Sequence, residues 1–162
     1  MALSLDSNAW YSIQNFANDG NLNWQSDATP YSILADEGSG SLWQVADYGS
    51  FYGSSASGAY VIRSQNDPDL CLAVQDGTPT LLTCDATNAN DLEIGQASDD
   101  SGDQGSTIYT SDGEFLEVTS PSAPATVEVT ASAPTDSSLV SLLWTFNSVG
   151  AINDDTWSTV SC

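Results

Sequence analysis

The sequence predicts an all-β protein built from three similar units, each with four short strands. The first observation is an internal repeat whose units close on the same apolar–polar–apolar pattern, at 41–45, 91–94 and 142–146. The central residues of these patterns, Trp43, Leu92 and Trp144, are 49 and 52 positions apart. The second observation is that clusters of Gly, Pro, Asn, Asp and Ser recur about every ten positions between alternating segments, as in barrels and sandwiches.

Three units of four strands give twelve strands around a pseudo-threefold axis, which is the number in a β-trefoil. A β-propeller also has four-stranded repeats, but propellers typically have at least four blades and this chain has room for three. We therefore expect one β-trefoil domain over 1–162. Its repeats are expected at about 8–50, 57–98 and 105–150, with a C-terminal tail at 151–162.

The elements of each unit follow in the same order. Opening strands are predicted at 10–13, 60–62 and 107–109, and matched turns follow at 18–20, 66–68 and 111–113. Second strands are predicted at 22–24, 70–74 and 115–118, and third strands at 31–36, 80–85 and 126–131. The repeat predicts six equivalent core residues: Leu22, Leu72, Leu116, Trp43, Leu92 and Trp144.

The charge of the chain limits its partners. Asp and Glu number 22 against one cation, Arg63, and no His, so the formal net charge is −21. Acids scattered through the turns favour a soluble, solvated surface. Such a surface cannot neutralise phosphates, so we expect neither nucleic acid nor membrane insertion among its partners. The absence of Lys and the abundance of Ser, Thr, Gly and Asn favour a secreted, extracellular or cell-surface location.

Two of the three cysteines lie on predicted neighbouring strands. A bridge between Cys71 and Cys84 would close a short loop and add about 3 kcal/mol of stability; two buried thiols are the alternative. The odd residue, Cys162, suggests either a dimer through an intermolecular bridge or the boundary of a longer chain.

The second unit resembles one repeat of the ricin B-type lectins. The similarity lies in residues 69–77, with Cys71-Leu72-Ala73-Val74, and in 81–85 and 88–92. In that family a Cys-Leu-Asp-Val strand is bridged to a Cys that closes the third strand, and an Asn-rich loop and a Gln-x-Trp motif follow. The resemblance implies a divergent, fungal-like secreted member. It also implies up to three shallow sites for galactose-type glycans, without metal, cofactor or catalysis.

The family's site residues carry over in part. Its sugar-holding Asp is replaced by Asn23, Ala73 and Glu117, and the stacking ring of its third strand by Ile33, Leu82 and Val127. The candidates that keep sugar-compatible chemistry are Asn23, Tyr31, Asp36 and Ser41 in the first unit and Asp76, Asp85 and Asn90 in the second. The third keeps Glu117 alone and is expected to be structural. Any of these polar residues could instead bond its own backbone in a turn.

The same sequence bears on other functions. With no His or Lys a Ser or Cys nucleophile lacks its usual base, so we expect no enzyme, although a carboxylate pair remains open on residue types. The acidic loop 99–106 could offer oxygen ligands to Ca²⁺, but its spacing matches no EF-hand, so no metal is expected. The alternatives are a β-trefoil protease inhibitor, which a rigid protruding loop would favour, and a structural or effector-like protein that has lost the sugar site.

Overall fold

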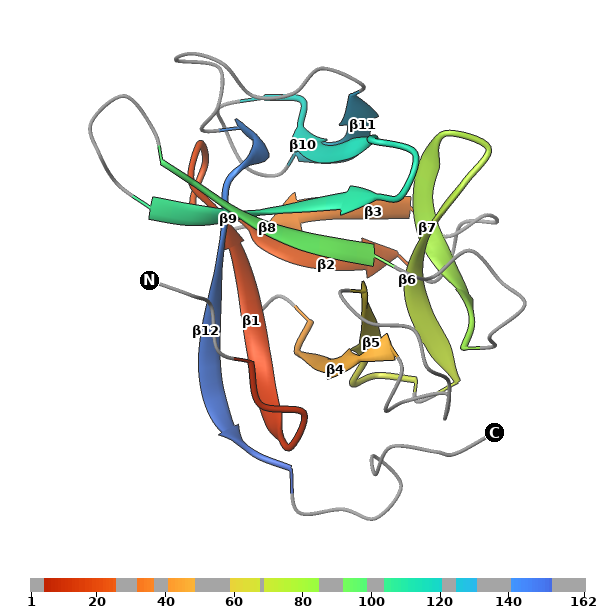
Figure 1. Ribbon diagram of the computed structural model, residues 1–162, viewed down its shortest axis with the longest axis vertical. Coiled ribbons are helices and arrows are strands. Elements are labelled where there is room, and N and C mark those ends of the chain that lie inside the picture. Colours follow the sequence, from red (N-terminus) through yellow and green to blue (C-terminus); the bar gives the residue numbers. More distant parts are fainter. Residues whose placement is uncertain are drawn as a thin grey trace.

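The computed structural model describes residues 5–25, 32–36, 41–48, 59–67, 69–84, 92–98, 104–120, 125–130 and 141–152. These residues form a single 12-stranded sheet (Figure 1). The first unit contains β1 (Ala9–Asn15), β2 (Asn21–Gln25), β3 (Ser32–Asp36) and β4 (Trp43–Asp47). The second contains β5 (Ala59–Ser64), β6 (Leu70–Gln75), β7 (Thr78–Thr83) and β8 (Leu92–Ser98), and the third β9 (Gln104–Thr110), β10 (Phe115–Val118), β11 (Ala125–Thr130) and β12 (Trp144–Ala151).

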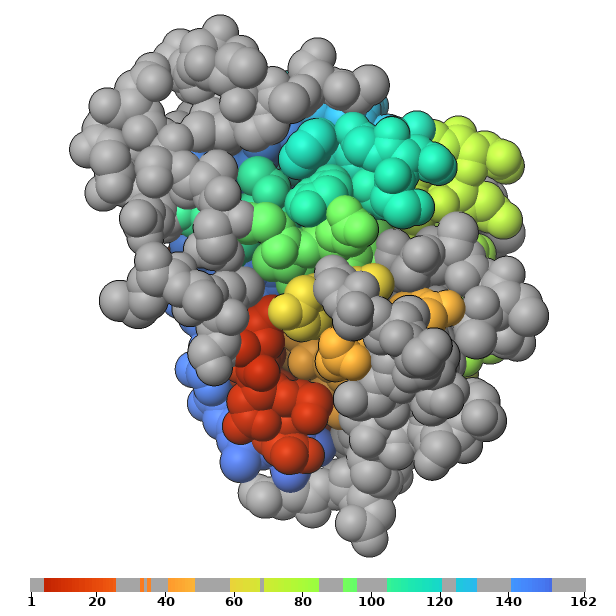
Figure 2. All heavy atoms as spheres, viewed as in Figure 1, coloured from red at the N-terminus to blue at the C-terminus, as the bar shows by residue number. Residues whose placement is uncertain are grey.

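Six of the strands close into a barrel. Each strand pairs antiparallel with the next in the order β1, β4, β5, β8, β9 and β12, and β12 pairs with β1 to close the ring. Figure 2 shows part of this wall as one surface from β1 (red) through β4 (orange) and β5 (yellow) to β8 (green). The remaining strands form three hairpins, β2–β3, β6–β7 and β10–β11, and β11 also pairs with β3. A barrel with three hairpins is the β-trefoil that the repeat predicts.

Strand register demonstrates the pseudo-threefold symmetry. In each unit the closing residue pairs with one residue of its own opening strand and one residue of the next: Trp43 with Tyr11 and Ser64, Leu92 with Tyr60 and Thr110, Trp144 with Ser106 and Asn15. Trp43, Leu92 and Trp144 are all fully buried. The prediction that these three residues are equivalent core positions is therefore confirmed.

The core is built from the same positions in each unit. Strand β1 alternates buried and half-buried residues along its whole length, as a strand with one face on a core must. Two positions beyond the paired residue of each opening strand lies a fully buried isoleucine: Ile13, Ile62 and Ile108. The predicted Leu22, Leu72 and Leu116 are also fully buried.

Three equivalent polar residues hold the turns that follow the opening strands. Asn15 Oδ1 accepts from the Ala17 amide at 2.8 Å, and Ser64 Oγ accepts from the Asn66 amide at 3.2 Å. Thr110 Oγ1 accepts from the Glu114 amide at 3.3 Å. A short polar side chain at each of these strand ends satisfies a turn N–H that would otherwise lack a partner. The symmetry thus extends from the apolar core to the polar turns.

The predicted disulfide between Cys71 and Cys84 is present, with Cα atoms 5.1 Å apart. Cys71 is fully buried against Ala46 and Val61 in a second, smaller core. Cys162 lies outside the described residues. Within the described part of the chain, no helix has the length and apolarity that a membrane-spanning helix needs.

Candidate functional site

In the first unit the structure brings together two of the predicted site residues. Asn23 lies in the middle of β2, half-buried on the face opposite the core residue Leu22. Ser41, 5% exposed, lies two residues before the first residue of the closing strand β4. Its hydroxyl donates a hydrogen bond of 2.6 Å to Asn23 Oδ1 and accepts one of 3.5 Å from Asn66 Nδ2. The pair therefore joins the second strand of the unit to the segment that leads into its fourth.

This arrangement fixes the orientation of the Asn23 amide. Oδ1 also accepts from the Trp24 backbone amide at 2.9 Å, so both of its lone pairs are used. The Nδ2 group is then the part of Asn23 that can donate to a ligand. A fixed donor at a half-exposed position on a rigid strand is well suited to recognising a hydroxyl oxygen.

The other two candidates of the first unit are only partly placed. Tyr31 lies outside the described residues. The backbone of Asp36 is opposite Asn21 in the β2–β3 hairpin. Leu82 lies opposite Cys71 and Thr130 opposite Phe115, so Asp36, Leu82 and Thr130 are equivalent positions.

That register corrects the expected alignment of Ile33, Leu82 and Val127. The closing residue follows the third-strand position by 7 residues in the first unit, from Asp36 to Trp43, and by 10 in the second, from Leu82 to Leu92. Ile33 and Val127 are equivalent, opposite Trp24 and Val118, but the matching residue of the second unit is Pro79, opposite Val74, and not Leu82. Loops vary in length more readily than the strands they connect, so the longer connection before Leu92 shifted the expected position along the strand.

In the second unit Asp76 lies at the tip of the β6–β7 hairpin. Asp76 and Gly77 form its two-residue turn with φ values of 52° and 76°. Two consecutive left-handed residues are typical of the tight hairpin turns in which Asp-Gly is favoured. Asp85 and Asn90 lie outside the described residues.

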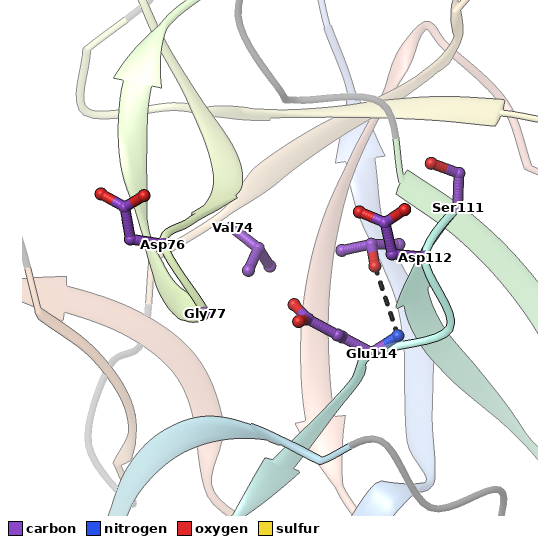
Figure 3. A pocket seen from close by; sticks show the side chains of 7 residues that line it. Val74, Asp76, Gly77, Ser111, Asp112 and Glu114 are labelled. Atoms are coloured by element: carbon purple, nitrogen blue, oxygen red, sulfur yellow. Dashed lines mark hydrogen bonds between the residues drawn. The ribbon is translucent and has the colours of Figure 1, made fainter.

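Asp76 also borders a cleft of about 250 Å³ between this tip and the turn after β9 (Figure 3). The cleft is lined by Val74, Asp76, Gly77, Thr110, Ser111, Asp112 and Glu114. Figure 3 shows the Glu114 side chain pointing toward Val74 and Gly77. The cleft thus offers carboxylate oxygens beside a small apolar surface, which suits hydroxyl or amine donors. No group of three His, Cys, Asp or Glu residues in the described part of the chain is placed to hold a metal ion.

Sequence reasoning missed the second wall of this cleft. Ser111 and Asp112 were expected as turn residues, and the turn is present, but it belongs to the third unit while Asp76 belongs to the second. A repeat-by-repeat comparison does not reveal which turns of different units face one another.

In the third unit Glu117 occupies the position equivalent to Asn23. Glu117 on β10 is opposite Glu128 on β11. Nearby, the rings of Tyr109 and Phe115 stack with centroids 5.0 Å apart and planes at 29°. Partial burial, followed by the charge and hydrogen bond of Glu93 on the neighbouring strand, raises the pKa of Tyr109. These surroundings therefore favour the protonated form of the Tyr109 phenol.

Comparison with known proteins supports the fold. No protein-family model matches the chain, and no curated protein matches it in sequence. Among solved structures, Cry35Ab1 superposes with a TM-score of 0.70 at 16% identity over 92% of this chain, which spans 38% of that protein. The ricin B-like lectin of Macrolepiota procera, solved with lactose, gives 0.64 at 15% identity, covering 91% of this chain and all (100%) of the lectin.

A third similar structure is the C-half of an earthworm R-type lectin, solved with GalNAc. It gives a TM-score of 0.60 at 14% identity over 87% of this chain and 99% of its own. At these identities the similarity establishes the fold, so the chain is a β-trefoil with the architecture of ricin B-like lectins.

Proposed function

We propose that the protein is a non-catalytic carbohydrate-binding protein, secreted or at the cell surface, that binds galactose-type glycans. The observation that carries the proposal is the hydrogen bond between the buried Ser41 and the half-buried Asn23, because it joins two predicted sugar-binding residues. The fold supports it, since two proteins of the same fold were solved with lactose and GalNAc. The absence of His and Lys from the sequence supports binding without catalysis.

Each side chain of the first unit has a role in this proposal. Asn23 donates its Nδ2 protons to a sugar hydroxyl, while Ser41 keeps the amide in place. Asp36 accepts from a second hydroxyl, and Tyr31 supplies the ring that covers the apolar face of the sugar. One ring with two or three directional polar groups is the usual composition of such a site. The cleft at Asp76 would provide a further set of hydroxyl acceptors in the second unit.

The test starts with a glycan array, followed by titration of the best neutral sugar against variants. Asn23→Ala removes one neutral hydrogen bond and should weaken binding about threefold to tenfold. Tyr31→Ala removes a stacking ring and should cost about 1 kcal/mol or more. Glu117→Ala is the matched control, a half-exposed residue at the position equivalent to Asn23, and should leave binding unchanged.

Two outcomes would overturn the proposal. Loss of binding in Glu117→Ala with none in Asn23→Ala would move the site to another unit. No binding of any sugar by the unchanged protein at millimolar concentration would remove the lectin function altogether.

A specific feature favours protease inhibition as the second candidate. The four residues at the tip of the β6–β7 hairpin, Gln75 to Thr78, are all exposed, and the disulfide links the two strands near its base. A constrained, projecting hairpin loses little conformational entropy on entering an enzyme cleft. A panel of secreted proteases assayed with the protein and with an Asp76→Ala variant tests this candidate, which requires inhibition that the variant weakens.

A further inference from the structure

A second cavity lies where β1 ends and the turn after it begins. It has a volume of about 220 Å³ and is lined by Gln14, Asn15, Phe16, Asp19 and Thr145. Gln14 and Thr145 are directly opposite each other on β1 and β12. The remaining residues belong to the end of β1 and the turn after it. The lining therefore combines one ring, two amides, one carboxylate and one hydroxyl.

Internal hydrogen bonds fix the polar groups of this cavity. Gln14 Nε2 donates to the Asp19 carbonyl at 2.9 Å, which leaves Oε1 as an acceptor. Asn15 is fully buried and uses both ends of its amide, donating to the Ser141 carbonyl at 3.0 Å and accepting from Ala17. Asn15 thus forms part of the floor, and Gln14, Asp19 and Thr145 supply the groups that a ligand can reach.

The ring of Phe16 packs against a glycine that leaves room for it. An added Cβ on Gly105 of β9 would lie 3.0 Å from Phe16 Cζ and 3.1 Å from Leu143 Cβ. The absence of a side chain at Gly105 lets the ring rest on the barrel wall. The Phe16 amide also donates to the Leu143 carbonyl at 3.0 Å. The ring is therefore a fixed apolar wall of the cavity.

Among the described residues, the other two equivalent positions carry different side chains. Arg63 on β5 and Gln44 on β4, which are both buried, correspond to Gln14 on β1 and Thr145 on β12. Tyr109 on β9 and Glu93 on β8 form the third such pair. Of these three pairs, the one at Gln14 and Thr145 contains neither a buried cation nor a carboxylate.

We infer that this cavity binds a single neutral pyranose ring, as a second carbohydrate site separate from Asn23 and Ser41. Its volume lies below the roughly 300 Å³ at which drug-sized pockets begin, so it fits one sugar unit. Gln14 Oε1 and the Asp19 carboxylate accept from hydroxyls, Thr145 donates or accepts, and Phe16 contacts the C–H face. The choice of a sugar as the ligand rests on the proposed function.

Charge excludes acidic sugars from this cavity. Arg63 is the single Lys or Arg of the whole sequence, and it is 6% exposed and donates to Gln44 Oε1 at 3.4 Å. No side-chain cation of the chain is therefore available to pair with a sialic acid carboxylate or a sulfate. Asp19 would instead repel such a group.

The test is an amide-resolved NMR titration with lactose, and with 3′-sialyllactose as the acidic comparator. Gln14→Ala removes the acceptor, and Asp19→Asn removes the charge with a residue that tolerates the φ of 55° at this position. Each should raise the Kd for lactose, obtained from the shifts at Thr145 and Asn15, about threefold to tenfold. Asn23→Ala should leave these shifts unchanged, and 3′-sialyllactose should bind no tighter than lactose. Unchanged thermal melting verifies that each variant is folded.

The variants separate this inference from the proposed function. Shifts at Thr145 that both Gln14→Ala and Asp19→Asn weaken support the cavity, even if Asn23→Ala has no effect and the site at Asn23 is refuted. Lactose binding that depends on Asn23 and never perturbs Thr145 overturns the cavity and leaves the proposed function standing. Binding that neither set of variants weakens overturns both assignments, and so does the absence of any binding.

Discussion

Trp43 and Trp144 occupy the same position in two different units, and each uses its indole in the same way. Trp43 Nε1 donates to the Leu22 carbonyl at 3.1 Å, and Trp144 Nε1 donates to the Leu116 carbonyl at 3.3 Å. Each bond connects the fourth strand of a unit to its second. Leu92 at the equivalent place in the second unit has no such donor, and that unit instead carries the Cys71–Cys84 disulfide.

Replacing either tryptophan by phenylalanine should destabilise the protein by similar amounts. Trp43→Phe and Trp144→Phe each remove one buried hydrogen bond and leave a carbonyl without its donor, which costs about 1–3 kcal/mol. Equilibrium urea unfolding measures the change. Val149→Ala, at a side chain that is 57% exposed, is the control and should change stability by less than about 0.5 kcal/mol. A tryptophan variant as stable as this control would contradict the equivalence.

Removing the disulfide should cost more than removing the third cysteine. Replacing Cys71 and Cys84 together by alanine opens the loop between two residues that are 13 positions apart in sequence. The loss of this constraint on the unfolded chain should lower the free energy of unfolding by about 3 kcal/mol. Urea unfolding with and without reductant gives the value, and reductant should have no effect on the double variant. Cys162→Ala should leave the monomer as stable as before. Sedimentation of the unchanged protein and of Cys162→Ala decides between the two interpretations of Cys162, because a dimer bridged through this residue would be lost in the variant.

The Tyr109–Glu93 pair predicts a change in stability at alkaline pH. Partial burial first, and then the charge and hydrogen bond of Glu93, raise the pKa of Tyr109 in the folded protein. A raised pKa means that the pair contributes stability below the unfolded pKa and loses it as pH rises through the folded pKa. The Tyr109 titration is obtained by subtracting the phenolate absorbance of Tyr109→Phe. Glu93→Gln should move it to lower pH, and Glu117→Gln, the control, should not.

The net charge of −21 predicts that salt stabilises the fold at neutral pH. Self-repulsion of a highly charged surface favours expansion, and about 0.15 M salt reduces the screening length to about 8 Å. The melting temperature at pH 7 should therefore rise by a few degrees between about 10 mM and 500 mM NaCl. Near the isoelectric point, pI ≈ 4.1, the same salt should have little effect. An equal rise at both pH values would indicate a cause other than repulsion.

The fold was predictable because its determinants are local and repeated. Strand β1 shows its buried face as an alternating pattern, and Trp43, Leu92 and Trp144 mark the repeat directly. The polar turn residue Asn15 and its equivalents were not predicted, since Asn, Ser and Thr share no obvious pattern in sequence.

The candidate sites were less predictable because they depend on contacts between distant segments. Ser41 and Asn23 were each chosen from a family pattern, and the structure shows a contact between them that the pattern did not predict. The cleft at Asp76 and the cavity at Phe16 each need a partner from another part of the trefoil, Glu114 and Thr145 respectively. Neither partner is signalled by sequence spacing.

The burial of Arg63 also determines how readily trypsin-like proteases cleave the protein. Proteases that cut after Lys or Arg have one cleavable bond in the entire chain, between Arg63 and Ser64. That bond lies within β5, whose residues pair with β4 on one side and β6 on the other. A trypsin-like enzyme can therefore reach it only when the barrel opens. Both cysteines of the disulfide lie C-terminal to this bond, so the bridge would not link the two fragments after cleavage. The appearance of two fragments would therefore report the opening of the barrel as a single event.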